Sequence, residues 1–421
     1  MTDEPVRPRL GRAYRKVLTA SAISSLGDGV DAAAFPLFTA ALTKDPRLVA
    51  LTGTAATLPW LGFSLIAGAL VDRWDRRRVM VTVNAVRAVL VGAVALIAGT
   101  HHGHIWMLLL IFLALGVCET FFDNAAQSLL PAVVVPELLE RANARQGVAQ
   151  QLGNQFVGPP LGALLFSVAI AVPFGIDAAS FALSAILIAS LTGSFRPLAA
   201  IDAPAAQRSI KREVGEGLRW LRSHRLLRTL AFELGIMNLC TQLGFSTLVL
   251  FARQKLHVGT RMFGFLLTGF ALGGLFGGLI GARLAKRLGA GTALRMAMIA
   301  TGGSMLLIGL QRNWIAVVSL SMITGTFEVI WNVITVSLRQ QIIPDHLFGR
   351  VNSAYRFLGW GGMPIGAALG GLVAHAFGLR APFVLAGIIS LVAVVPAFPI
   401  VTTANIAAAR TAAPRRDVSG A

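Results

Sequence analysis

Long apolar runs separated by short polar segments recur along the whole chain of 421 residues. Each run holds about 20 residues, which is enough for a helix to cross a hydrocarbon core ~30 Å thick. The pattern therefore predicts an all-α polytopic membrane protein with twelve transmembrane helices. The expected spans are 17–43, 47–71, 79–100, 105–128, 145–170, 173–193, 228–251, 261–284, 292–310, 314–338, 349–376 and 381–402.

The composition agrees with a membrane protein. Hydrophobic residues make up 55% of the chain and charged residues 13%, and the mean hydropathy is +0.70. A soluble domain of this size has about a quarter charged residues. Both cysteines, Cys118 and Cys240, fall inside apolar runs, so no disulfide framework is expected. The basic N-terminus leads straight into the first span without a small-residue cleavage site, so no separate secretory signal is expected.

The net charge of +18 is unevenly distributed among the loops. Lys and Arg gather before the first span, between spans 2 and 3, between spans 6 and 7, after span 8 and at the C-terminus, whereas the alternate loops hold few. The positive-inside rule then predicts a cell-membrane protein with both termini in the cytoplasm. The basic balance thus indicates membrane topology, and no nucleic-acid partner is expected.

The two parts of the chain repeat each other at an offset of 209 positions. The matched pairs are Gly116 with Gly325, Glu119 with Glu328, Asp123 with Asn332, Arg141 with Arg350, Asn143 with Asn352, and Pro173-Phe174 with Pro382-Phe383. The repeat predicts two six-helix halves, residues 1–193 and 228–421, joined by a cytoplasmic linker at 194–227. The end of the linker reads as a basic amphipathic helix, either a solvated connector or a lipid-binding element.

The stretch GALVDRWDRRRVM, Gly68–Met80, crowds charges between spans 2 and 3, and such charges cannot lie in hydrocarbon. It resembles the G-x-L-x-D-R-x-x-R-R loop between the second and third helices of the major facilitator superfamily. Together with Arg141-x-Asn143 and Phe174-x-x-Asp177, it makes the chain similar to the bacterial exporter branch that includes the enterobactin exporter and macrolide efflux pumps. Two six-helix halves with a site between them near the midplane are typical of this superfamily.

The resemblance implies a set of gating residues. In the superfamily the loop braces one end of the transporter and releases it during transport, and its aspartate lies near the start of span 11. The positions that match are Gly68, Asp72, Arg73, Arg76 and Arg77, with Arg350 at the start of span 11. Span 5 carries the antiporter-like G-P-x-x-G residues Gly158, Pro159 and Gly162, with Asn154 where a further glycine is expected. As alternatives to gating, the arginines could serve only to set the membrane topology, and the glycines could serve only to let helices pack closely.

Acids inside the predicted spans are the candidate binding sites, because buried carboxyl groups usually face a cavity or a partner. The set is Asp28, Asp31, Glu119, Asp123 and Glu328, with Trp331 beside Glu328. The resemblance implies that spans 1, 4, 7 and 10 line a central cavity, and three of these hold the acids. The structural alternative for each acid is a local ion pair. For Arg87 an ion pair is favoured, and for Asp177 a helix cap.

The chain has no nucleotide-binding loop and no catalytic or haem motif, so neither an enzyme nor a cofactor is expected. The sequence predicts a proton-coupled exporter of an amphipathic small molecule such as a drug, macrolide or siderophore, working by alternating access. Its partners would be the substrate, protons and the lipid bilayer, and it would act as a monomer, as is usual in the superfamily. An importer, an uncoupled facilitator and a non-transporting receptor or scaffold remain alternatives.

Overall fold

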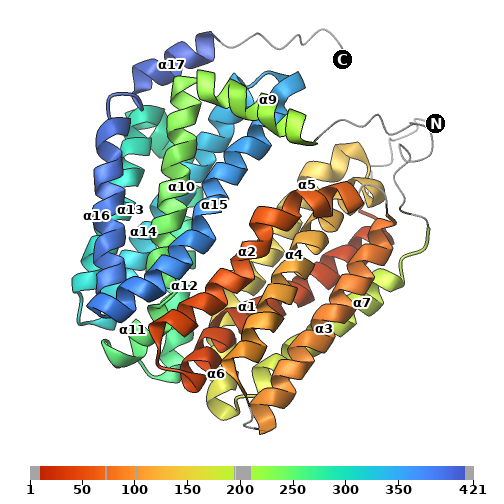
Figure 1. Cartoon of the computed structure of the whole chain (residues 1–421). Helices are drawn as coiled ribbons and strands as arrows, with labels where there is room; N and C mark the ends of the chain where they lie inside the picture. Colours follow the sequence, from red (N-terminus) through yellow and green to blue (C-terminus); the bar gives the residue numbers. More distant parts are fainter. Residues whose placement is uncertain (1–9, 72–73, 101–102, 194, 196–209, 413–421) are drawn as a thin grey trace, which may run out of the picture. The chain divides into compact units, whose positions relative to one another are not determined.

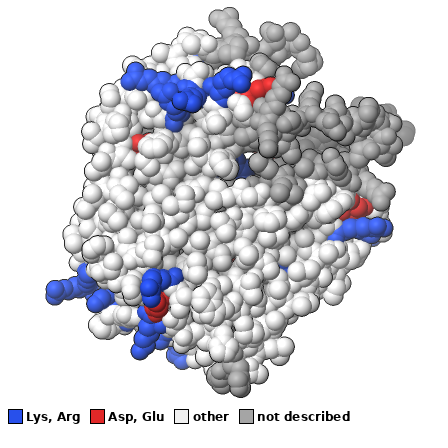
Figure 2. Space-filling model, viewed as in Figure 1, with Lys and Arg blue, Asp and Glu red and all other residues white. Residues whose placement is uncertain are grey.

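The computed structural model describes residues 10–71, 74–100, 103–193, 195 and 210–412 of the chain. These residues form helices joined by short loops, and no strand occurs among them (Figure 1). On the face seen in Figure 2, Lys and Arg occur in a few small groups, and most of the described surface is uncharged. The described residues belong to two compact units, each considered by itself below.

Unit 1 comprises Met1–Thr43, Ala55–Pro204 and Gly259–Thr268. Its elements are α1 Arg12–Leu42, most of α2 Pro46–Val71, α3 Arg76–Thr100, α4 Ile105–Val133, η1 Pro136–Leu138, α5 Leu139–Gln151, η2 Leu152–Val157, α6 Gly158–Val168, α7 Val172–Ala189 and the start of α12 Thr260–Leu288. In this unit α1 packs against α6, η2 and α7, and α3 packs against α4 and α7.

Unit 2 comprises Lys44–Thr54, Ala205–Val258 and Gly269–Ala421. Its elements are the start of α2, α9 Ile210–Ser223, α10 Arg225–Phe245, α11 Leu248–Gln254, the rest of α12, α13 Ala290–Leu310, α14 Trp314–Ile342, α15 Asp345–Phe377, α16 Ala381–Ala397 and α17 Thr403–Thr411. Here α10 packs against α15 and α16, α13 packs against α14 and α16, and α9 packs against α15.

The all-α prediction is confirmed for the described residues. Among them, 8 helices are long and apolar enough to cross a membrane. These are Arg76–Thr100, Ile105–Val133, Val172–Ala189, Arg225–Gln254, Thr260–Leu288, Ala290–Leu310, Trp314–Ile342 and Leu347–Phe377. Each of the other predicted spans also contains helix, but the count of twelve membrane-spanning helices stays a prediction.

The predicted fifth span is an interrupted helix. The segment 145–170 contains the end of α5, the π-helical turn η2 and α6. Pro159 and Pro160 at the start of α6 have no N–H to donate to the carbonyls of Gln155 and Phe156, so the regular α-helical ladder cannot continue across them. A π-turn is a common way to absorb such a break, and it often marks a functional site.

Two further boundaries differ from the prediction. The predicted seventh span is divided near Ser246 and Thr247 into α10 and α11. The last predicted span, 381–402, ends early: α16 stops at Ala397 and the short helix α17 follows. Thr402 caps α17, because its Oγ1 accepts a 3.1 Å hydrogen bond from the Asn405 N–H.

Glycine stripes bring helix backbones into contact inside each unit. A methyl group added at Gly362, Gly366 or Gly370 of α15 would overlap a carbonyl oxygen of α10. The sequence repeat is visible in the same kind of packing. Gly116 of α4 lies against Ala56 of α2, and its repeat partner Gly325 of α14 lies against Phe270 of α12. Small residues are therefore required where these helices approach most closely.

Candidate functional site

Two glycines of α1 place the acids of unit 1 deep among the helices. A side chain at Gly27 would overlap the carboxyl group of Asp177 in α7, and one at Gly29 would overlap the backbone of Gly153 and Asn154 in η2. The backbone of α1 is therefore in direct contact with α7 on one side and with the π-turn on another. Asp28 lies between these two contacts, and Asp31 follows one helical turn later.

Asp31 and Asp177 form a buried pair of carboxyl groups. Their side chains are 6% and 1% exposed, and they lie within hydrogen-bond reach of each other. Asp177 also accepts a 2.9 Å hydrogen bond from Ser180 Oγ. Asp31 Oδ1 and Asp177 Oδ2 have no donor in the described part of the protein. Two carboxyl groups bond to each other only when one of them carries a proton, so the pair is suited to holding a proton.

Arg87 of α3 supplies the positive charge next to these acids. Its side chain is 5% exposed, and its guanidinium lies 5.3 Å from the ring centre of Phe122 and 5.2 Å from that of Phe181. It interacts electrostatically with Asp28 and Asp177. Arg87 thus acts on acids of neighbouring helices that belong to the candidate site, and the expected ion pair stays a prediction.

The two acids of α4 differ in exposure. Asp123 is partly buried and Glu119 is exposed, and both act electrostatically on Asp28. The structure therefore gathers the four predicted acids of the first half, Asp28, Asp31, Glu119 and Asp123, into one region.

The structure adds Asp177 to this region, although a helix cap was expected for this residue. That interpretation is wrong, because α7 begins at Val172 and Asp177 lies in its second turn.

Unit 2 holds separate acids. Glu328 of α14 is partly buried, and its Oε1 accepts a 3.0 Å hydrogen bond from Thr241 of α10. Glu233 of α10 is 3% exposed and was missed by the sequence interpretation, although an acid within a predicted span was the signal used for the others. Trp331 is 1% exposed and belongs to the main hydrophobic cluster of unit 2. Its predicted place on a substrate-binding surface is therefore corrected to a place in the core.

The described part of the charged loop after α2 braces helix ends. Arg76 donates a 3.0 Å hydrogen bond to the Ser128 carbonyl near the end of α4, and Arg77 donates to the Leu191 carbonyl just after α7. Asp75 accepts from the Arg78 N–H at 3.1 Å. Asp72 and Arg73 lie outside the described residues, and Gly68 is described only as part of α2. Arg76 and Arg77 thus bond to the ends of two other helices.

Arg350, the expected neighbour of Asp72, has a partner from the linker helix. Its Nη1 lies 2.6 Å from Oε2 of Glu216 in α9, with both side chains 31% exposed. The backbone of α9 also touches that of α15, since a side chain at Gly217 would overlap the Arg350 carbonyl. The linker helix therefore packs on the start of α15, and this contact accounts for its apolar face, including the buried Leu221.

The glycines of the G-P-x-x-G stretch face α1. Side chains at Gly158 and Gly162 would overlap the backbone of Gly29 and Val30. The neighbouring Pro159 contributes its carbonyl to a contact with Gly264, in the part of α12 that belongs to unit 1. The stretch thus holds α6 against the helix that carries Asp28 and Asp31, and its gating role stays a prediction.

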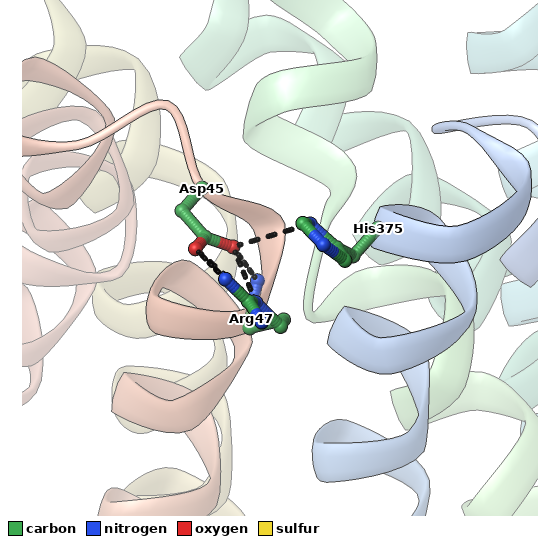
Figure 3. Close-up of polar contacts among 3 residues, drawn as sticks. All are labelled: Asp45, Arg47 and His375. Atoms are coloured by element: carbon green, nitrogen blue, oxygen red, sulfur yellow. Dashed lines mark hydrogen bonds and ion pairs between the residues drawn. The ribbon is translucent and has the colours of Figure 1, made fainter.

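A polar cluster at the start of α2 completes unit 2 (Figure 3). Asp45 caps α2 by accepting from the Arg47 N–H at 2.9 Å, and its Oδ2 lies 2.7 Å from Arg47 Nη2. Nδ1 of His375, on α15, lies 3.8 Å from Asp45 Oδ1. The hydrogen bond from the Arg47 side chain holds the pKa of Asp45 below its usual range. This carboxylate therefore stays charged, whereas His375 forms an ion pair with it only when protonated.

Comparison with known proteins adds a family and relatives of known name. A family model described as transmembrane secretion effector matches residues 4–416. The multidrug efflux pump Tap of Mycobacterium tuberculosis is 27% identical over 382 residues, covering 87% of this chain and 88% of the pump. The enterobactin exporter EntS of Shigella boydii is 25% identical over 366 residues, covering 86% of this chain and 85% of the exporter.

Solved structures agree on the fold. The nucleoside transporter NupG matches with a TM-score of 0.75 at 11% identity, covering 93% of this chain and 100% of that structure. A bacterial homologue of the lysosomal transporter Spinster, in an inward-facing state, matches with a TM-score of 0.67 at 14% identity, covering 95% of this chain and 96% of the homologue. At such low identity the likeness concerns the fold alone.

Proposed function

Because this chain belongs to the transmembrane secretion effector family of the major facilitator superfamily, we propose that it exports an amphipathic small molecule in exchange for protons. Members of this superfamily are transporters, and the chain is accordingly a multi-pass membrane protein and not an enzyme. The names of the relatives support the direction of transport, since one is a multidrug efflux pump and another a siderophore exporter.

The observation that carries the proposal is the buried carboxyl pair of Asp31 and Asp177. Two ionised carboxylates in contact repel each other, so the pair binds a proton as a unit. When that proton leaves, Arg87 is close enough to compensate the negative charge that remains. A group that gains and loses one proton within a transporter is what antiport requires.

Asp28 connects proton binding to the substrate in this proposal. It is less deeply buried than Asp31, and it interacts electrostatically with Glu119 and Asp123 of α4. A cationic or hydrogen-bonding substrate near these acids would compete with protons for the same negative charge. Glu328, held by Thr241, is the corresponding acid of the second half. This competition drives release of the substrate when the site opens to the more acidic side.

The remaining assignments follow from the charge distribution and the loop. The surplus of Lys and Arg in alternate loops favours a cell-membrane location with both termini in the cytoplasm. Gating by Gly68, Asp72, Arg73, Arg76, Arg77 and Arg350 is part of the proposal, as are the halves 1–193 and 228–421. The protein is proposed to act as a monomer.

The test uses purified protein in liposomes with an imposed pH gradient. Flux of lipophilic cations, macrolides and catecholate siderophores is measured for the wild type and for Asp31→Asn, Asp177→Asn and Asp28→Asn. Gradient-driven flux of at least one compound is expected for the wild type. Each substitution is expected to lower it about tenfold or more, which corresponds to at least ~1.4 kcal/mol.

Glu140→Gln is the matched control, because Glu140 is an exposed acid at the start of α5, away from the pair. Proton release on substrate binding, measured in weakly buffered detergent solution, gives a second readout. Flux that ignores the gradient and all three neutralisations would leave an uncoupled facilitator. Gradient-driven accumulation in the opposite direction would indicate an importer, and substrate binding without flux a receptor.

A further inference from the structure

A cavity of about 420 Å³ lies in unit 2 beside the short helix α17. It is lined by the last turns of α12, the second half of α14, the first residue of α13, Ala290, and α17 itself. It is separate from the acids of the candidate transport site. Its polar lining consists of Lys286, Arg410, Ser337 and Thr403, and no acidic residue is part of the lining.

The two cations face this cavity from different helices. Lys286 lies in the last turn of α12, and Arg410 in the last turn of α17. Neither forms an ion pair within the described residues. A cation at a helix C-terminus is favourable by itself, because it complements the helix dipole. The dipole does not explain why two such cations, brought together from distant parts of the chain, border one cavity with two hydroxyl groups. Two cations and two hydroxyl groups on one cavity suit a negatively charged ligand.

The rest of the lining is apolar. Ala282 and Ala285 of α12, Val333 and Ile334 of α14 and Ile406 of α17 form the walls. Val333 is 40% exposed, so the apolar wall continues onto the outer surface of α14. Both α12 and α14 are long and apolar enough to cross a membrane, and the cavity lies toward the end of each. The ligand that suits such a site has a negative head and an apolar tail.

We propose that this cavity binds the phosphate group of an anionic phospholipid, with the acyl chains along the apolar surfaces of α12 and α14. Lys286 and Arg410 neutralise the phosphate, and the hydroxyl groups of Ser337 and Thr403 are placed to donate hydrogen bonds to it. Basic pockets between transmembrane helices are a common form of lipid headgroup site. The lipid would thereby hold α17 against α12 and α14.

The test measures lipid retained by the full-length protein in detergent, using native mass spectrometry. Phosphatidylglycerol and phosphatidylcholine with identical chains are compared, and inorganic phosphate is added as a competitor in a third arm. The wild type is expected to retain phosphatidylglycerol in preference to phosphatidylcholine. The double variant Lys286→Gln with Arg410→Gln is expected to bind phosphatidylglycerol roughly tenfold more weakly.

Two further variants separate a built site from general attraction. Arg283→Gln with Arg287→Gln removes the same charge from exposed positions of α12 that do not line the cavity, and this pair is expected to retain the lipid. Ala407→Phe fills the cavity while both cations stay, and it is expected to lose the lipid.

Equal binding of the two lipids, or equal losses in both double variants, would overturn the proposal. Displacement of phosphatidylglycerol by inorganic phosphate at similar concentration would replace it with a site for free anions. Because no substrate is added, the outcome is independent of the proposed transport.

Discussion

His224 makes the start of α10 sensitive to pH. It is the N-cap of this helix, and its Nδ1 accepts a 3.4 Å hydrogen bond from the Leu227 N–H. Its ring stacks on Trp220 with a centroid distance of 5.3 Å. Burial lowers the pKa of His224 from the ordinary value of 6.5. Protonation removes the lone pair that accepts the bond, so the cap exists only in the neutral form.

Acidification is therefore expected to destabilise the junction of α9 and α10. Between pH 6.5 and the lower pKa of the folded state, the unfolded chain binds more proton at His224 than the folded chain does, so the free energy of unfolding falls as the pH falls through this range. The loss is expected to be about 1 kcal/mol, the usual contribution of a helix N-cap. Melting temperatures at pH 7.5 and 5.5 measure it.

His224→Asn is the matched variant, because asparagine caps a helix equally well without titrating in this range. The melting temperature of this variant is expected to fall less on acidification than that of the wild type. An equal fall in both proteins would show that other groups cause the acid sensitivity.

At the level of residues, the sequence indicated which acids lie within helices better than it indicated the residues around them. Asp28 and Asp31 were recognisable as charged residues within an apolar span. Asp177 was misinterpreted as a helix cap because it lies near the predicted start of a span. The structure shows that α7 already begins at Val172. Trp331 was misplaced, since a tryptophan near an acid occurs both in cavities and in cores, and only the packing distinguishes them.

At the scale of whole elements, the close contact between α10 and α15 depends on the glycines of α15. Gly366→Ala places a methyl group against the carbonyl of Leu239, so the helices must separate. A lowered melting temperature is expected, equivalent to roughly 1–3 kcal/mol for an overpacked interface.

Gly303→Ala provides the comparison. Gly303 lies within α13 and has open space where a Cβ would be added. Alanine favours helix over glycine by about 1 kcal/mol, so this variant is expected to keep or raise the melting temperature. Equal effects at the two positions would mean that helix propensity, and not close packing, determines the result.

The length of the apolar runs predicted where helices occur, but it did not predict where those helices are interrupted. The spans carrying α3, α4, α13 and α14 match uninterrupted helices, because their apolar runs contain no strong break near the middle. Pro159 and Pro160 mark the interruption of the fifth span, but the sequence does not reveal that the π-turn η2 before them packs on α1 through Gly153. The last predicted span was placed too far, to residue 402, because the residues that follow the end of α16 at Ala397 are also largely apolar.

At the scale of the whole molecule, two helices are shared by the two units. The part of α2 before Ala55 belongs to unit 2, and the part of α12 up to Thr268 belongs to unit 1. The repeat predicted two similar halves, but a comparison of the chain with itself cannot reveal this exchange, because it depends on packing between distant segments. Any change in the relative position of the units must bend these helices or release their ends.

Pro59 weakens α2 at the place where it passes from one unit to the other. Its nitrogen has no hydrogen to donate to the carbonyl of Ala55, the first residue of α2 in unit 1. Pro59→Ala restores this bond and is expected to stiffen α2. Transport is expected to slow several-fold at an unchanged substrate dissociation constant, with a raised melting temperature.

The control is Pro36→Ala in α1. This proline also lies inside a helix, but α1 belongs entirely to unit 1. The control is expected to transport at the wild-type rate. If both variants slow transport alike, flexibility of α2 is not the determining property.

The sharing of α2 and α12 also determines how the chain can be divided. A fragment of residues 1–193 lacks residues 259–268, which complete unit 1, and carries residues 44–54 without the helices they pack on. The complementary fragment, residues 194–421, lacks residues 44–54 of unit 2 and carries residues 259–268 without most of unit 1. Each fragment therefore lacks a segment that the other one supplies. Produced separately, both are expected to aggregate or be degraded; produced together, they are expected to associate without a covalent link and restore the complete protein.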